Sequence, residues 1–224
     1  MLIRNYDYDP RLFEATVYRS RWGSRRVVGT GDCLWGLVDG VNDAGLAVSL
    51  TFGGRREVGE GFGVPLVIRY LLEACDDVAS ATAVLARLPH QLSYNITLCD
   101  RAGAVATVYV APDRPARVTA EACTTNHPEV VEWPEHAAWV RSVERLEALR
   151  ALHHDGADAD VVVAAMLAPP FLARQWDEGF ATLYCAVYRP TSGTLTYHWP
   201  ARTEPIDLAQ PLPSAFEAAL APGE

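Results

Sequence analysis

The alternation of hydrophobic and polar residues along the chain predicts three β-hairpins. Each consists of two β-rich runs that flank a turn-rich link, and the three pairs are 34–38 with 46–52, 94–99 with 104–110, and 182–188 with 194–199. Residues 12–18 form a further β-rich run. In the run 46–52 the large apolar residues share one face, whereas Ala47, Ser49 and Thr51 share the other. We therefore expect one face of this strand to pack large side chains and the other to carry small ones.

Two helices are predicted between the first and second hairpins. The first begins at Pro65, where the missing N–H of proline costs nothing, and residues 66–75 are apolar nearly all round. Arg69 and Glu73 form its only polar stripe, so we expect this helix to be largely buried. The second helix covers about residues 78–88 and ends before a proline.

Two more helices are predicted between the second and third hairpins, over about residues 134–153 and 159–167. In the first of them apolar residues recur at helical spacing, and these are Trp139, Val143, Leu146, Leu149 and Leu152. After Pro200 the chain is rich in proline, so we expect residues 201–224 to form an irregular tail.

The order of these elements is strands, two helices, strands, two helices and strands. Hairpins grouped apart from helices favour an α+β fold with antiparallel sheets covered by helices. A four-layer αββα sandwich satisfies this order, and a two-layer α+β domain is the alternative. The 224 residues are 50% hydrophobic, which suits one core, so we predict a single domain over residues 1–224.

Charge and cysteine content narrow the class of protein. The net charge of −9, without a Lys/Arg block, argues against nucleic acid as a partner and against docking on an anionic membrane. No apolar run is long enough to span a bilayer, and the start carries no secretory signal. Five scattered cysteines without a C-x-x-C pair argue against disulfides and a zinc site. We expect a cytoplasmic protein without a cofactor.

Charged residues stand out at the start of the chain, in Arg4-Asn5-Tyr6-Asp7. The aspartate could hold an amine and the arginine could orient it, whereas an exposed ion pair on an edge strand is the alternative. Residues 4 and 7 fall on opposite faces of a regular strand. Their joint action therefore requires a bend or a bulge between them.

Three further polar positions could carry chemistry. Asn95 could donate to a developing oxyanion, or it could simply be a polar residue that starts a strand. In the segment Thr125-Asn126-His127 the histidine could be a base, or a turn histidine satisfied by backbone or water. Arg145 lies close to the apolar side of its helix and could point inward, or snorkel to solvent.

Two other patterns point away from chemistry. The glycine-rich loop 59–63 lacks the G-K-[ST] ending of a phosphate-binding loop, and its acidic neighbours would repel phosphate. We expect it to form a mobile rim of a pocket. His153 and His154 are adjacent on a helix and cannot face one metal ion together.

Taken in order, the polar segments resemble a known family. The succession is Arg4-Asn5-x-Asp7, Trp35 to Leu46, Asn95 before Asp100-x-x-Gly103, Thr125-Asn126-His127, Ser142-x-x-Arg145 and Thr182-Leu183-Tyr184. It is similar to the acyl-coenzyme A:6-aminopenicillanic acid acyltransferase family of cysteine N-terminal-nucleophile (Ntn) hydrolases, related to choloylglycine hydrolases and penicillin V acylases. Each motif is weak alone, but their order and spacing across nearly the whole chain are fairly specific.

The resemblance implies an αββα Ntn fold and action on linear amides through a thioester, by hydrolysis or by acyl transfer. The nucleophile would be an N-terminal cysteine freed by autoproteolysis, with its own α-amino group, of pKa about 7.7–8, as the base. The resemblance places Asp7 and Arg4 beside that cysteine and makes Asn95 the oxyanion donor. Asn126 would support the amine and the tetrahedral intermediate, and Arg145 would be the helix arginine of the site.

The nucleophile that the resemblance requires is missing from this sequence. Only Met1, Leu2 and Ile3 precede Arg4, and none of them can serve. Because the polar set is intact, we expect a cysteine upstream of Met1, and we expect the 224-residue form to be inactive. A catalytically dead ligand-binding protein is the alternative, and an unrelated hydrolase built on Cys33 is a weaker one. The expected partner is a small-molecule amide or acyl thioester, and a homo-oligomer is compatible with the sequence.

Overall fold

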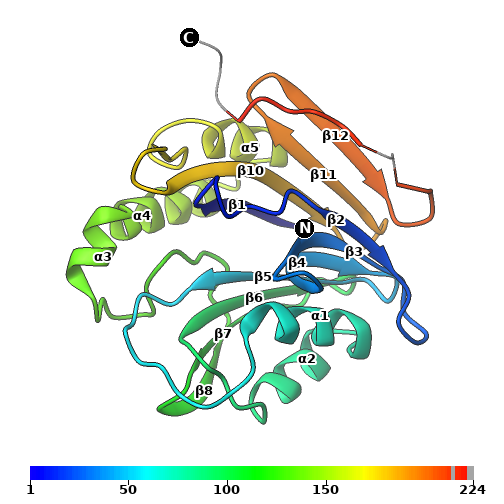
Figure 1. Ribbon diagram of the computed structural model, residues 1–224, viewed down its shortest axis with the longest axis horizontal. Coiled ribbons are helices and arrows are strands. Elements are labelled where there is room, and N and C mark those ends of the chain that lie inside the picture. The colour runs from blue at the N-terminus through cyan, green and yellow to red at the C-terminus, as the bar shows by residue number, and fades with distance from the viewer. Residues whose placement is uncertain (213–214, 221–224) are drawn as a thin grey trace.

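The computed structural model describes residues 1–212 and 215–220. Its strands form two antiparallel sheets that face each other (Figure 1). The smaller sheet has the order β1-β10-β11-β12, with β9 paired to β10. Its strands are β1 (Leu2–Tyr8), β9 (Arg174–Gln175), β10 (Phe180–Arg189), β11 (Thr194–Trp199) and β12 (Arg202–Asp207).

The larger sheet follows the order of the chain from β2 to β8. Its strands are β2 (Val17–Ser20), β3 (Val27–Asp32), β4 (Gly36–Asn42), β5 (Leu46–Phe52), β6 (Tyr94–Asp100), β7 (Val105–Ala111) and β8 (Arg114–Thr119). The three predicted hairpins are present as the pairs β4–β5, β6–β7 and β10–β11.

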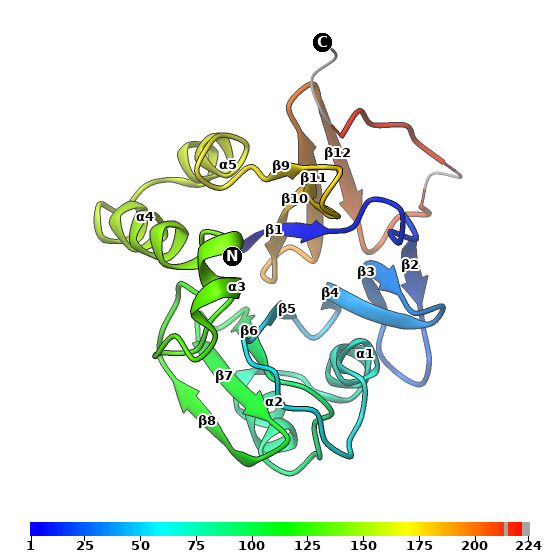
Figure 2. The same cartoon turned by 60° about the vertical axis from the view of Figure 1, so that its left-hand side comes forward.

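Helices cover the outer faces of both sheets (Figure 2). On the larger sheet, α1 (Val64–Ala74) packs against β4 and β5, and α2 (Val78–Leu85) packs against β6 and β7. Beside the smaller sheet lie α3 (Pro134–Trp139), α4 (Ser142–His154) and α5 (Ala159–Met166), and α5 packs against β1. The predicted αββα sandwich of two antiparallel sheets flanked by helices is confirmed.

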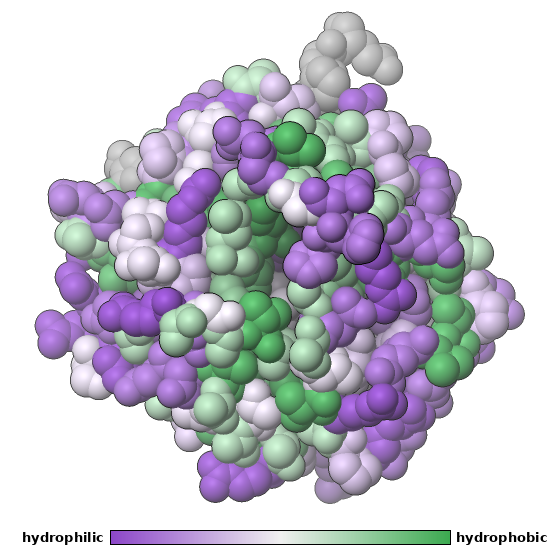
Figure 3. All heavy atoms as spheres, turned by 180° about the vertical axis from the view of Figure 1, so that it is seen from behind, coloured by the Kyte–Doolittle hydropathy of each residue, from purple (hydrophilic) through white to green (hydrophobic). Residues whose placement is uncertain are grey.

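The core between the sheets combines aliphatic residues of the larger sheet with aromatic residues of the smaller one. Val28 and Val41 are fully buried on one side, and Tyr184 and Tyr197 on the other. At the surface, hydrophilic side chains predominate on the face shown in Figure 3, and hydrophobic ones gather around a hollow near its centre. The polar tips of the buried tyrosines require partners inside the sandwich.

The pairing of β1 with β10 is irregular near the end of β1. Tyr6 pairs with Tyr184, but Asp7 pairs with Thr182, so one residue of β10 is left over between them. Because the extra residue, Leu183, belongs to β10, this register shift is a β-bulge in β10 opposite Tyr6 and Asp7. The pairing is thus irregular between residues 4 and 7, but no residue is inserted in β1 itself.

Four local predictions were wrong. Residues 12–16 are not a strand; β2 begins only at Val17, because Ala15 has a positive φ of 50° and turns the chain. The predicted helix 134–153 is two helices, because the chain between α3 and α4 turns at Arg141, which has a left-handed φ of 54°. Residues 202–207 of the predicted irregular tail form β12, whose pairing with β11 satisfies their backbone.

The fourth wrong prediction concerns the apolar face of the predicted helix 134–153, and the polar stripe of α1 is buried as well. Arg69 is buried and donates to Glu73, whereas Leu66 and Tyr70 of α1 face outward. The Arg69 guanidinium also stacks on the Trp22 ring and donates to the backbone carbonyl of Trp35. These contacts compensate the buried positive charge. Similarly, the side of α4 that is most buried carries Ser142 and Arg145. Apolar Trp139 and Val143, expected to face inward, are exposed.

Candidate functional site

A cavity of about 270 Å³ runs along one edge of β1. Six of the first seven residues line it, and its other walls come from β5, β6, the segment 122–126 and the helices α4 and α5. Of the five predicted site residues, four line this cavity, and these are Arg4, Asp7, Asn126 and Arg145. Asn95 does not. Elements far apart in sequence thus bring most of the predicted set together.

Arg4 crosses from the smaller sheet to the larger one. Its Nη1 donates to Asp39 Oδ2 at 2.8 Å and to the backbone carbonyl of Val38 at 3.1 Å. Burial alone lowers the pKa of Arg4, but the Asp39 carboxylate raises it, and the net pKa lies above the ordinary value. Arg4 therefore stays charged, and Asp39 fixes where that charge is held.

Asp39 is itself fully buried and held from three sides. Besides Arg4, Tyr184 donates its hydroxyl to Oδ2 at 2.6 Å, and the backbone N–H of Thr30 donates to Oδ1 at 3.2 Å. Burial and the nearby Asp39 carboxylate raise the pKa of Tyr184, so this hydroxyl keeps its proton. A buried carboxylate with this many donors is compensated for the water it has lost.

Asp7 faces the helical layer instead. Arg145 of α4 donates to Asp7 Oδ2, and Thr182 of β10 donates to Oδ1 at 2.6 Å. The same guanidinium also donates to the backbone carbonyl of Phe171. Two charged residues of one short motif thus serve two layers, with Arg4 paired across the sandwich and Asp7 paired to α4, as expected for opposite faces of a strand.

Asn126 sits on a loop that several hydrogen bonds hold in place. Asn95 donates both N–H groups of its side chain, to the carbonyls of Thr125 and His127, each at 2.8 Å. His127 Nδ1 lies 2.6 Å from Ser142 Oγ at the start of α4. Burial lowers the pKa of His127, which favours the neutral ring. In this arrangement Asn95 and His127 position the loop, and an oxyanion role for Asn95 would require one of its two bonds to break.

The backbone of Gly54 passes very close to this loop. A Cβ built on Gly54 would lie 2.3 Å from the carbonyl oxygen of Asn126, and Gly54 has a positive φ of 62°. Only glycine fits such an approach without displacing the loop. No hydrogen bond joins the Asn126 side chain to another residue of the part of the chain that the structure describes, so its amide is available in the cavity.

Two hydroxyl residues of the cavity were missed as site residues. Ser49 and Thr51 of β5 line it, and Thr51 is the register partner of Asn95 on β6. The sequence signal was present, because these residues belong to the face of 46–52 that was expected to carry only small side chains. Small residues on an inner face leave room, and here that room is the cavity.

The thiols at the cavity are not activated. Cys99 and Cys123 line it, but both are buried, and burial raises the pKa of each thiol. A raised pKa keeps these thiols protonated, whereas the thiolate is the nucleophile. Cys33 is exposed in a turn and does not line the cavity. Burial, together with the nearby Asp32 and Glu14, raises its pKa as well.

The Asn5 side chain, next to the cavity residues Arg4 and Asp7, has one buried polar atom without a hydrogen-bond partner. Its Nδ2 donates to the carbonyl of Met166 at 2.7 Å, but its buried Oδ1 has no hydrogen-bond partner in the described part of the chain.

Within residues 1–212 and 215–220, no group of three His, Cys, Asp or Glu side chains could hold a metal ion. No described helix is long and apolar enough to cross a membrane. In the glycine-rich loop, Gly61 packs closely against the backbone of His90.

Comparison with known proteins adds a family and a fold. The family model described as acyl-coenzyme A:6-aminopenicillanic acid acyl-transferase matches residues 1–204. Penicillin V acylase from Agrobacterium tumefaciens superposes with a TM-score of 0.60 at 16% identity, over 91% of this chain and 77% of that one. No curated protein sequence matches the chain.

Two further solved structures have the same fold. An N-acylethanolamine-hydrolyzing acid amidase orthologue from Caenorhabditis elegans has a TM-score of 0.54 at 16% identity, over 84% of this chain and 87% of that one. A mutant of the conjugated bile acid hydrolase from Clostridium perfringens has a TM-score of 0.53 at 14% identity, over 92% of this chain and 84% of that one. At these identities the likeness establishes the fold alone.

Proposed function

The chain belongs to the acyl-coenzyme A:6-aminopenicillanic acid acyl-transferase family, and from that premise we propose that it forms most of a cysteine Ntn hydrolase or acyltransferase for linear amides. The nucleophile comes from a segment that precedes Met1, and the 224-residue form is inactive. The substrate is a small-molecule amide or acyl thioester. Neither a metal nor another cofactor takes part, and the protein works in the cytoplasm, as a monomer or a homo-oligomer.

The observation that carries this proposal is the cavity along β1. It brings together Arg4, Asp7, Asn126 and Arg145, while its own thiols have raised pKa values. In the described part of the chain, β1 pairs only with β10, so its other edge is unpaired, and most residues of β1 line the cavity. A preceding extended segment that paired with this edge would place its residues beside Asp7 and Arg4.

The chemistry would divide among these residues as follows. The thiol gives its proton to the α-amino group of the same cysteine and attacks the amide carbon, which forms a tetrahedral oxyanion. Asp7 holds the resulting ammonium, and Arg4 supplies positive charge beside the sulfur. Asn126, together with Asn95 or Thr51, donates to the oxyanion. The ammonium then protonates the leaving amine, and a thioester remains for water or a second amine to attack.

The test compares two expressed forms of the protein. One begins at Met1, and the other includes all in-frame codons upstream of it. We expect release of amine from N-acyl amides only by the longer form, after its maturation to an N-terminal cysteine, and loss of that activity when the cysteine is replaced by alanine. An upstream region without a cysteine codon, or an inactive longer form that carries one, would contradict the proposal.

The same observation leaves one other function to consider. A protein that keeps the cavity and lacks the nucleophile would bind an amide without cleaving it. Thermal stabilisation of the longer form by N-acyl amides, without turnover, would favour this ligand-binding protein over the enzyme.

A further inference from the structure

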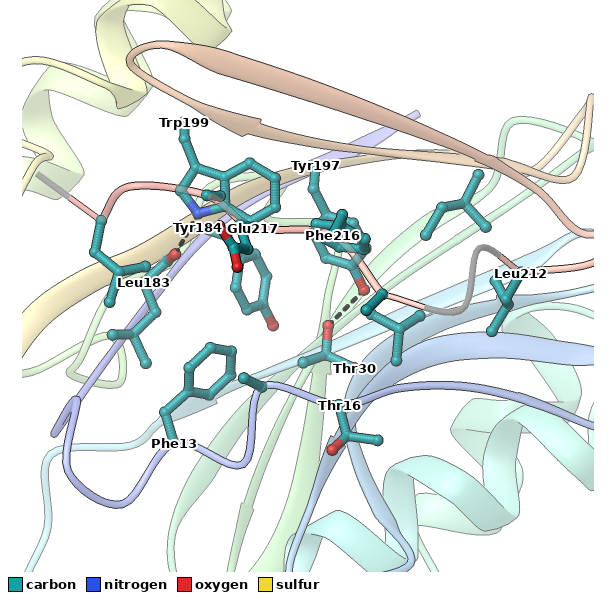
Figure 4. Close-up of a pocket in the computed structure, with 16 residues that line it drawn as sticks. Phe13, Thr16, Thr30, Leu183, Tyr184, Tyr197, Trp199, Leu212, Phe216 and Glu217 are labelled. Carbon is teal, nitrogen blue, oxygen red and sulfur yellow. Dashed lines mark hydrogen bonds between the residues drawn. The ribbon is translucent and has the colours of Figure 1, made fainter. Parts of the chain in front are cut away.

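A second and larger cavity lies between the two sheets, outside the cavity along β1. Its volume is about 770 Å³, within the usual range for small-molecule sites. One wall is the inner face of β10, β11 and β12, and the opposite wall comes from residues 13–17 and β3. Described residues of the C-terminal segment 212–220 close it. Figure 4 shows the rings of Phe13, Tyr184, Tyr197 and Trp199 gathered around this space.

The deep polar groups of this cavity are already paired with the protein. Thr30 Oγ1 and the Tyr197 hydroxyl lie 2.7 Å apart, and Trp199 Nε1 donates to the carbonyl of Leu183 at 2.7 Å (Figure 4). The Tyr184 hydroxyl donates to Asp39. A ligand rich in hydroxyl or charged groups would lose its water here without finding replacements. The cavity is therefore suited to a hydrocarbon group, either alkyl or aryl.

One charged side chain lines the cavity, and Arg202 lies next to it, 5.3 Å from the centroid of the Phe216 ring, with its guanidinium paired to Glu204. Among the described lining residues only Glu217 is charged, and it is exposed on the C-terminal segment. None of these described lining residues is a lysine or an arginine that could receive a carboxylate or phosphate. A ligand whose head group is neutral or cationic therefore fits this rim better than one whose head group is anionic.

The cavity adjoins the residues of the proposed site through β10. Thr182 holds Asp7, and the next residue, Leu183, lines the hydrocarbon cavity. Tyr184 lines it too, while its hydroxyl holds Asp39, the partner of Arg4. We propose that this cavity binds the apolar acyl group of a neutral amide and discriminates against anionic amphiphiles. Its identity as the substrate's acyl site rests on the proposed function, whereas the binding does not.

Binding can be measured on the chain as it exists, because it needs no nucleophile. Isothermal titration with unbranched primary amides of six to ten carbons should show affinity that rises about fourfold per added methylene until the cavity is filled. Decanamide should bind more tightly than decanoate by up to about fivefold at low salt. Affinity that does not change with chain length, or tighter binding of decanoate, would overturn the proposal.

Two neighbouring alanines give matched variants. Ala218 lines the cavity, whereas Ala219 is exposed beside it and does not. Ala218→Phe should fill space and weaken decanamide binding at least tenfold, while Ala219→Phe leaves it unchanged. Equal effects of the two substitutions on decanamide binding would show that decanamide does not bind in this cavity and would overturn the proposal. Glu217→Gln tests the rim separately. It should reduce the difference in affinity between decanamide and decanoate, and an unchanged difference would overturn the proposed discrimination against anionic ligands.

These results are separable from a failure of the proposed function. If the longer form cleaves no amide while chain-length-dependent binding persists, the proposed enzyme is wrong and the hydrocarbon cavity stands. If the longer form cleaves amides but Ala218→Phe does not change their KM, the acyl group binds elsewhere and this inference is wrong.

Discussion

Arg145 and Asp7 form a buried ion pair that joins α4 to the end of β1, opposite the bulge in β10. Removing one partner leaves a buried charge uncompensated, so Arg145→Met should lower the free energy of unfolding by about 3–5 kcal/mol. Urea denaturation measures this loss. Arg141→Met, which breaks the exposed pair with Glu144, is the control and should cost less than about 1 kcal/mol.

The double variant sharpens this prediction. When Asp7→Asn accompanies Arg145→Met, no unpaired charge remains, so the double variant should be more stable than the sum of the single losses predicts. Simple additivity of the two losses would contradict a direct interaction between these side chains.

Protonation of buried histidines should destabilise the fold in mild acid. Burial lowers the pKa values of His90, His127, His136 and His198. The unfolded chain therefore binds protons more readily, so their contribution to stability is present above about pH 6.5 and is lost as the pH falls below it. The free energy of unfolding, measured by denaturation between pH 7.5 and 5, should decrease.

A single substitution tests how much His127 contributes to this pH dependence of the free energy of unfolding. His127→Asn should reduce the slope of unfolding free energy against pH by at most about 1.4 kcal/mol per pH unit, the value for one proton. His154→Asn, at an exposed position on α4, serves as the control. Equal slopes for the wild type and for His127→Asn would contradict a neutral, buried His127.

Gly54→Ala should displace the loop that carries Asn126. The added Cβ meets the Asn126 carbonyl. In addition, the alanine must adopt the left-handed backbone conformation of Gly54, which alone costs about 1–2 kcal/mol. Gly103→Ala is the matched control, because Gly103 has a positive φ of 88° but nothing within 4 Å of its Cβ. A larger loss of melting temperature for Gly54→Ala measures the contact, and equal losses would show that the loop adapts freely.

Cys33 should be the thiol that reacts in the folded protein. It is exposed, whereas the other four cysteines are buried. Because its pKa is raised, iodoacetamide should modify it slowly at pH 7 and faster as the pH increases. Peptide mass spectrometry identifies the modified residue. If the longer, active form is obtained, Cys33→Ala should retain full activity, and a loss would instead favour a hydrolase built on Cys33.

The sequence predicted the architecture better than it predicted side-chain directions. Hairpins follow from local alternation and turn residues, so β4–β5, β6–β7 and β10–β11 were identified correctly. The spacing of Arg4 and Asp7 places them on opposite faces of a strand, and their partners do lie in different layers, Asp39 in the larger sheet and Arg145 on α4. Which partners they would choose was not predictable.

The prediction of which helix face is buried was wrong where an ion pair overrode the apolar pattern. Arg145 turns inward because Asp7, far away in the sequence, is available to it, and Val143 is left exposed as a result. Arg69 is buried for the same kind of reason, with Glu73 and Trp22 as its partners. Such contacts depend on tertiary neighbours that no helical period encodes. The same holds for Asn95, whose two bonds to the Asn126 loop are visible only in the fold.

The unpaired edge of β1 also affects how the protein behaves at high concentration. Open backbone N–H and C=O groups are a template for any extended chain, and edge strands usually deter such pairing with outward-facing charges. Here Arg4 and Asp7 are engaged in ion pairs inside the fold, so they give β1 little of this protection. Strand-to-strand aggregation through β1 is thus one hazard when the 224-residue form is purified. A short peptide that occupies the edge should keep this form monomeric.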